Sequence, residues 1–178
     1  MKKSLAVVAV FAVAALALYA QQAQDKKPLS PKGNASLTFD DGKKVSISYS
    51  RPSMRGRKIM GGLVPYGKVW RTGANEATTF VTDTNLVLGG TNVPAGNYTL
   101  YSLPAENGWK LIINKQTGQW GTEYDQAQDL ARIDLKKEAA SSPMEQFTIA
   151  LDKKGADAGV LTLTWENTKL SADIKEQK

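Results

Sequence analysis

The 178-residue sequence contains no histidine and no cysteine. Without cysteine there are no disulfides, so the packing of a hydrophobic core must stabilise the fold. Without histidine there is no Ser-His-Asp triad, no HExxH zinc site and no ordinary general base with a pKa near neutral pH. Any enzymatic chemistry would therefore depend on carboxylates, lysine or tyrosine.

The first twenty residues have the pattern of a secretory signal peptide. Lys2 and Lys3 form a positively charged start, and residues 5–18 are an uncharged apolar run that ends in small residues. We place cleavage after Ala20, and neighbouring alanines would also fit. The apolar run is shorter than the roughly 20 residues that a membrane-spanning helix needs. We therefore expect an exported protein, periplasmic or extracellular, with no stable membrane span after cleavage.

Cleavage would leave 178 − 20 = 158 residues, enough for one domain with a sizeable core. Residues 21–34 are polar and contain two prolines, so we predict a flexible leader there. The domain itself is expected to cover residues 35–178.

The rest of the chain has the pattern of short β-strands. Apolar and polar residues alternate over about nine or ten segments, several of them separated by turn residues such as Asp40-Asp41-Gly42 and Asn107-Gly108. No long amphipathic helix is evident. The pattern predicts an all-β domain, a single antiparallel β-sandwich of the jelly-roll type, with a closed barrel as the alternative. We expect strands near 37–39, 45–49, 78–82, 86–88, 98–103, 109–114, 131–135, 147–151, 161–165 and 170–174.

Residues 49–79 interrupt this pattern and carry most of the unusual chemistry. They show little alternation, and their six basic side chains face one acid, Glu76, for a local charge of 6 − 1 = +5. The full chain has a net charge of +6, so its basicity is local, which suggests one anion-binding patch or one internal set of ion pairs. The segment is also rich in apolar residues, which a disordered linker would lack. We therefore predict a long ordered loop at 50–77.

The sequence of this segment, YSRPSMRGRKIMGGLVPYGKVWRTGANEATT, resembles the hallmark segment of the DUF2911 family, secreted bacterial proteins with no assigned function. The resemblance continues through VPAGNYTLYSLP and WKLIINK to QWGTEYD and covers most of the chain after about residue 35. It implies a β-rich fold and supplies no known activity.

Two interpretations of Arg71 and Glu76 are open. The two residues are five apart across Thr72-Gly73-Ala74-Asn75, where glycine and asparagine permit a tight return. The interpretation that we favour is a structural ion pair that holds the loop in place. In the other, Arg71 faces a ligand pocket. The predicted ligand-binding residues are Arg51, Arg55, Arg57, Tyr66, Trp70, Arg71, Asn75, Glu76, Trp120 and Tyr124.

A second irregular region, residues 119–134, is acidic. Its four acids are opposed by one arginine, so it offers the basic loop at most 1 − 4 = −3. Even complete pairing of the two segments would leave about two positive charges. The acids lack the glycine and the alternating carboxylates of a calcium loop, so we predict no metal site.

Together these features predict an exported, non-catalytic protein without a cofactor. Its basic, aromatic loop would bind an anionic or carbohydrate-like small molecule, a cell-envelope component or a partner protein. The alternative is a carboxylate-based, glycosidase-like hydrolase that uses Glu76 with an acid from 123–134, because that chemistry needs no histidine. We expect no nucleic-acid partner, because the basic residues form no known binding motif and the protein is exported.

Overall fold

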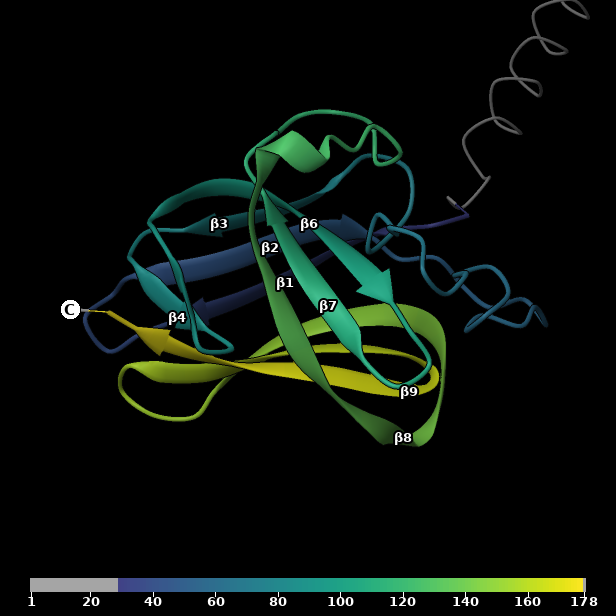
Figure 1. Ribbon diagram of the computed structural model, residues 1–178. Helices are drawn as coiled ribbons and strands as arrows, with labels where there is room; N and C mark the ends of the chain where they lie inside the picture. Colours follow the sequence, from purple (N-terminus) through teal and green to yellow (C-terminus); the bar gives the residue numbers. More distant parts are fainter. Residues whose placement is uncertain (1–28, 178) are drawn as a thin grey trace, which may run out of the picture.

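The computed structural model describes residues 29–177, which form nine β-strands (Figure 1). A short 3-10 helix, η1 (Gln126–Gln128), precedes the eighth strand. The predicted signal peptide and residues 21–28 of the predicted leader lie outside the described residues. Within residues 29–177, no helix has the length and apolar character needed to cross a membrane. The strands are β1 (Lys32–Thr38), β2 (Lys44–Ser50), β3 (Thr78–Thr82), β4 (Leu86–Leu88), β5 (Thr91–Val93), β6 (Gly96–Pro104), β7 (Trp109–Asn114), β8 (Asp129–Lys153) and β9 (Ala158–Glu176).

The nine strands form one antiparallel sheet in the order β1-β2-β3-β6-β7-β8-β9-β4-β5. The all-β, antiparallel prediction is therefore confirmed. The strand order does not divide the strands between two separate sheets, so the sandwich and jelly-roll detail stays a prediction. β1 begins at Lys32, so the ordered sheet includes the last three residues of the predicted leader.

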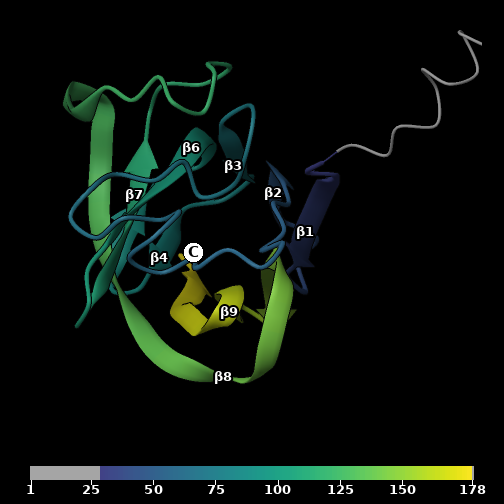
Figure 2. The ribbon, with the colours of Figure 1, turned by 90° about the vertical axis from the view of Figure 1, so that its right-hand side faces the viewer.

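β8 bends strongly and connects the two sides of the fold (Figure 2). Its first residues, from Asp129 to Leu135, pair with β7. Farther along, Phe147 N donates to the Pro52 carbonyl at 2.9 Å, next to the end of β2. The register against β9 shifts between Ala139 and Thr148, which is how bulges bend a long strand. β8 thereby brings its second half beside the basic loop.

β8 and β9 are longer than the sequence pattern predicts. We expected two strands, near 161–165 and 170–174, in place of β9, because the polar residues Asn167 and Thr168 separate them. Instead the buried positions run from Gly159 to Trp165, shift by one residue, and continue from Thr168. Glu166 has a left-handed φ of 53° at that shift. The polar pair therefore marks a bulge within one strand, because an extra residue inverts the alternation without ending the hydrogen-bonded ladder.

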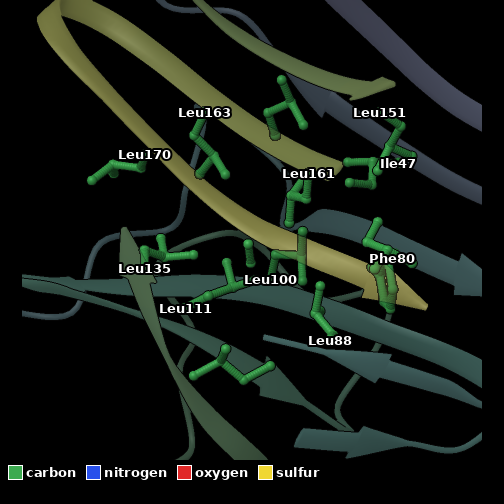
Figure 3. Packing of buried hydrophobic residues seen from close by; sticks show 14 of the residues in the cluster. Ile47, Phe80, Leu88, Leu100, Leu111, Leu135, Leu151, Leu161, Leu163 and Leu170 are labelled. Atoms are coloured by element: carbon green, nitrogen blue, oxygen red, sulfur yellow. The ribbon is translucent and has the colours of Figure 1, made fainter. Parts of the chain in front are cut away.

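The hydrophobic core lies between the strands of the folded sheet. Figure 3 shows side chains from distant parts of the chain, such as Ile47, Phe80 and Leu161, pointing into one apolar cluster. Most of these side chains are completely buried, and each contributes about 1.5–3 kcal/mol relative to an exposed position. The loop 51–77 joins this core through Ile59 and Val64, which are both fully buried.

The loop is also fixed by hydrogen bonds to two strands of the sheet and by a bridge to the segment 119–134. Met54 N donates to the Glu145 carbonyl at 2.8 Å, on β8. Trp70 and Ser102 exchange two backbone hydrogen bonds of 2.8 and 2.9 Å, which attach the loop to β6. The backbone of Glu76 forms a bridge with Trp120. The predicted long ordered loop is therefore confirmed. It follows one defined course over one side of the sheet.

Candidate functional site

The loop covers one end of the core with an aromatic cluster. The Trp70 ring stacks on Trp165 with a centroid distance of 5.7 Å and an interplanar angle of 21°. It also meets Phe147 and Trp109 edge-on, at 5.0 and 6.5 Å. Trp70 remains partly exposed, so these contacts hold its ring in place while part of it faces solvent. A fixed aromatic ring of this kind offers area to a ligand at little entropic cost.

Beside Trp70 lies a cleft of about 540 Å³, within the usual size range of ligand pockets. Most of its wall comes from the loop, and the rest comes from residues 29–30, the segment 121–124, and the side chains of Tyr101 and Trp165. Six of the ten predicted binding residues line it: Arg55, Arg57, Trp70, Arg71, Asn75 and Tyr124. Arg51, Tyr66, Glu76 and Trp120 are not part of the lining.

The cleft is basic. Arg55, Arg57, Lys68 and Arg71 line it, and none of the described lining residues is acidic. Among residues 29–177, no ion pair involves any of the six basic side chains of the loop. Their charge is therefore not neutralised by specific partners in the described part of the protein. The field in the cleft should attract anions.

The four arginines of the loop have different environments. Arg51 donates to the Phe147 carbonyl and to Thr148 Oγ1, at 3.3 and 2.9 Å, and so attaches the loop to β8. Arg55 donates to the Leu29 carbonyl at 2.7 Å. Arg57 donates to two carbonyls of its own turn. The Arg71 guanidinium has no hydrogen-bond partner within residues 29–177, although the side chain is half-buried, so its N–H donors are not used by the described part of the protein.

The predicted ion pair between Arg71 and Glu76 is wrong. Glu76 pairs instead with Lys32 of β1, at 2.6 Å, and both side chains are more than half exposed. The hydrogen bond from Lys32 lowers the pKa of the Glu76 carboxyl below its usual value. The reason for the error is the backbone between the two residues, in which Thr72 and Asn75 both adopt left-handed conformations. These conformations decide where the Glu76 side chain lies, and the sequence separation of the two residues does not reveal them.

The turn that follows Arg71 is strained. Thr72 has a φ of 51°, which is unfavourable for a β-branched residue and costs about 1–3 kcal/mol. Thr72 is completely buried, and its hydroxyl hydrogen-bonds to Ser102 Oγ at 3.1 Å. Its carbonyl accepts from Thr78 Oγ1 at 2.8 Å. The surrounding contacts thus hold a conformation that the chain would not adopt alone, which is common at functional sites.

The Arg71 stem packs against Gly121. A Cβ added at residue 121 would lie 2.7 Å from Arg71 Cδ and 2.6 Å from the Asn75 carbonyl oxygen. Gly121 N also donates to that carbonyl at 3.0 Å. The second irregular region therefore fixes the position of Arg71 by close packing, and no acid of that region pairs with it in the described structure.

Three of the four acids of residues 119–134 interact within their own region or with β7. Asp129 accepts from Arg132 and from the Tyr124 hydroxyl, at 2.9 and 2.7 Å. Asp134 pairs with Lys110, and Asp125 accepts from the N–H of Ala127 to cap η1. The pairing with the basic loop that would have compensated part of its charge is not seen among the described residues. The positive excess of the loop is therefore larger than the sequence arithmetic suggests.

Two tyrosines, Tyr101 and Tyr124, form part of the cleft wall. The Tyr101 and Tyr124 rings meet edge-on at 4.9 Å, and the Tyr101 hydroxyl donates to the Glu123 carbonyl at 2.9 Å. Burial and the hydrogen bond to Asp129 raise the pKa of Tyr124 to about 12. Both phenols are therefore neutral at physiological pH, and their hydroxyls are already engaged.

Sequence reasoning missed several lining residues. Lys68 was counted among the basic residues but was not placed in the site, although it is two residues from Trp70. Trp165 falls in a predicted strand, a position that indicates the core, and the residue is both buried and part of the cleft wall. Tyr101 was missed for the same reason. Within residues 29–177, no group of three or more acidic side chains is placed to hold a metal ion.

Comparison with known proteins gives a family. The model of a family described as "Protein of unknown function (DUF2911)" matches residues 30–174, which is most of the chain. No curated protein and no solved structure matches this chain. The matched residues include the whole basic loop and all of the cleft from Ser30 onward. The chain belongs to the DUF2911 family of proteins of unknown function.

Proposed function

We propose that the protein binds an anionic ligand with a ring or another flat apolar face in this cleft, and that it does so without catalysis. The main support for the proposal is the positive charge of the residues that line the cleft. Four basic side chains surround the cleft, none of the described lining residues is acidic, and none of the four is engaged in an ion pair within residues 29–177.

Arg71 is the central residue of the proposed site. Its stem is held by Gly121 and its guanidinium is free of protein partners in the described structure. A guanidinium can bind a carboxylate or phosphate through two parallel hydrogen bonds. Hydrogen bonds to charged groups are worth about 1.5–3 kcal/mol each. The rigid Trp70 ring beside it supports the second half of the proposal, because it can stack on a flat ligand.

The lining favours binding over the glycosidase-like alternative. That chemistry requires two carboxyl groups on either side of the scissile bond. Glu76, the acid that the alternative requires, pairs with Lys32 and is not part of the cleft lining. The sequence pattern of residues 1–20 adds the proposal that binding takes place outside the cytoplasm.

Isothermal titration with phenyl phosphate and glucuronate tests the proposal, with phenol and glucose as neutral counterparts. We expect the two anions to bind and the neutral compounds to bind much more weakly. Raising the salt to 1 M shortens the Debye length to about 3 Å and should weaken binding of the anions.

Matched variants separate the cleft from general charge. Arg71→Ala should weaken binding of both anions at least tenfold, because a charge-assisted pair is lost. Lys154→Ala removes the same charge from an exposed turn outside the cleft and should have little effect. Equal losses in the two variants, or equal binding of phenol and phenyl phosphate, would contradict the proposal.

A further inference from the structure

Two exposed leucines, Leu29 and Leu63, form an apolar rim of the cleft. Four large hydrophobic side chains are exposed within residues 29–177, and two of them line the cleft: Leu29 is 71% exposed and Leu63 is 44% exposed. A third, Trp120, is 48% exposed and directly precedes Gly121 of the lining. Single exposed apolar residues are ordinary, whereas several around one opening indicate a surface that contacts something apolar.

The interior of the cleft continues this apolar surface. Pro65, Val69, Ala74 and the two tryptophans contribute to its wall. The hydroxyls of the two wall tyrosines are already bonded within the protein, which leaves four uncharged hydrogen-bonding side chains in the lining, Ser30, Ser53, Asn75 and Thr122, against eight apolar ones. A sugar ring presents several hydroxyls that need partners when they are buried. This lining therefore suits an apolar ligand body better than a sugar.

Two basic groups of the lining are free to bind a charged head group. Arg71 and Lys68 have no hydrogen-bond partner in the part of the chain that the structure describes, whereas Arg55 and Arg57 donate to backbone carbonyls. Arg55 holds the Leu29 carbonyl at 2.7 Å, so the same residue adds positive charge and fixes part of the apolar rim. Charge and apolar surface thus meet in one cleft.

We propose that the natural ligand is an anionic amphiphile, a single molecule with an acidic head group and an apolar chain. Arg71 and Lys68 hold the phosphate or carboxylate head, and the chain extends past Trp70 to Leu29 and Leu63. This inference rests on the proposed function, since it assigns the ligand class of the same cleft. It goes beyond that function because it requires the rim as well as the cations.

A chain-length series measures the contribution of the apolar part. The probes are inorganic phosphate, phenyl phosphate, and butyl, hexyl and octyl phosphate below their critical micelle concentrations, titrated into the purified full-length protein. Octyl glucoside is the neutral control. We expect affinity to rise about fourfold per methylene while the chain lies in the cleft, the increment expected for a buried CH₂ group. Octyl glucoside should bind much more weakly than octyl phosphate.

Variants of the rim and of the cations separate the two halves of the ligand. Leu29→Ser with Leu63→Ser should reduce the affinity for octyl phosphate at least tenfold and leave that for inorganic phosphate unchanged. Leu130→Ser, at an exposed leucine outside the cleft, is the control. Arg71→Ala should weaken every phosphate in the series. All three leucines are exposed, so these variants are expected to fold, and circular dichroism checks that they do.

The possible outcomes distinguish failure of the amphiphile inference from failure of the proposed function. If phenyl phosphate binds and depends on Arg71 but chain length has no effect, the proposed function stands and the amphiphile is refuted. If no phosphate binds, both the proposed function and the amphiphile inference are refuted. Octyl phosphate that binds independently of Arg71 overturns the inference, since the head group would then lie elsewhere. Binding only to vesicles of anionic lipid, with none to the monomeric probes, would also overturn it in favour of a membrane surface.

Discussion

Removing one hydroxyl, in Tyr49→Phe, should weaken the connection between β2 and β8 that supports the basic loop. Tyr49 lies at the end of β2 and is buried. Its hydroxyl accepts from Ile149 N at 2.7 Å and donates to the Ile149 carbonyl at 3.3 Å. One side chain thus satisfies both backbone groups of a β8 residue that face away from β9. Its ring also meets Phe147 edge-on at 5.8 Å, and phenylalanine would preserve that contact.

The expected loss follows from the two orphaned groups. A buried N–H or carbonyl left without a partner costs about 1–3 kcal/mol, and Ile149 would have one of each. Some relaxation is certain, so we expect a decrease of about 2–4 kcal/mol in the free energy of unfolding. For a domain of this size, 1 kcal/mol corresponds to about 2–4 °C, so the melting temperature should fall by roughly 4–16 °C.

Urea denaturation followed by circular dichroism measures the change, with Tyr66→Phe as the matched control. The Tyr66 hydroxyl makes no hydrogen bond within residues 29–177 and the side chain is half-exposed, so its loss should be within about 0.5 kcal/mol. The dependence of the unfolding free energy on urea concentration (the m-value) should be the same in both variants, because neither change alters the surface area that unfolding exposes. A Tyr49→Phe variant as stable as Tyr66→Phe would refute the bonding of Ile149 described above.

Three further predictions concern the site. Tyr124→Phe should reduce the loss of stability at high pH. The pKa of this phenol is about 12 in the folded protein, above the ordinary value of 10, so the phenol favours folding below pH 10 and that contribution is lost as the pH rises to 12. Urea denaturation at pH 9 and pH 11 will measure the difference. Gly121→Ala should lower the melting temperature and weaken phenyl phosphate binding, since the methyl would meet a backbone oxygen at 2.6 Å, whereas Gly108→Ala, with open space around it, should do neither. Glu76→Gln should leave the melting temperature nearly unchanged, because the pair with Lys32 is exposed; a fall of several degrees would show that Glu76 has a buried role.

The sequence predicted the strand class well because alternation is a local property. Val45, Ile47 and Tyr49 recur at every second residue, and the structure buries all of them. The lengths of β8 and β9 were not predicted, because a bulge at Glu166 and a turn have the same local signature of polar residues and left-handed backbone. Only the pairing of the two strands over their whole length distinguishes the two cases, and pairing is not a local property.

The site was predicted in part for the same reason. Arg71, Trp70 and Asn75 were found because unusual residues gather in one irregular segment, and that segment forms most of the cleft. The partner of Glu76 was not found, since Lys32 is 44 residues away and only the fold brings it near. Trp165 was missed because its place in a strand indicated the core, and a residue at the end of a core can also line a cleft.

If the basic cleft beside Trp70 binds an acidic group, a ¹H–¹⁵N NMR titration with phenyl phosphate will locate the ligand there. We expect saturable shifts of the Arg71 Nε–H, of the backbone amides of Gly73 to Asn75, and of Gly121 and Thr122, all of which line the cleft. Signals of the exposed Lys154 and Lys175 should not move. Shifts confined to such exposed lysines, or no shifts at Arg71 while the ligand binds, would show that the cleft is not the binding site.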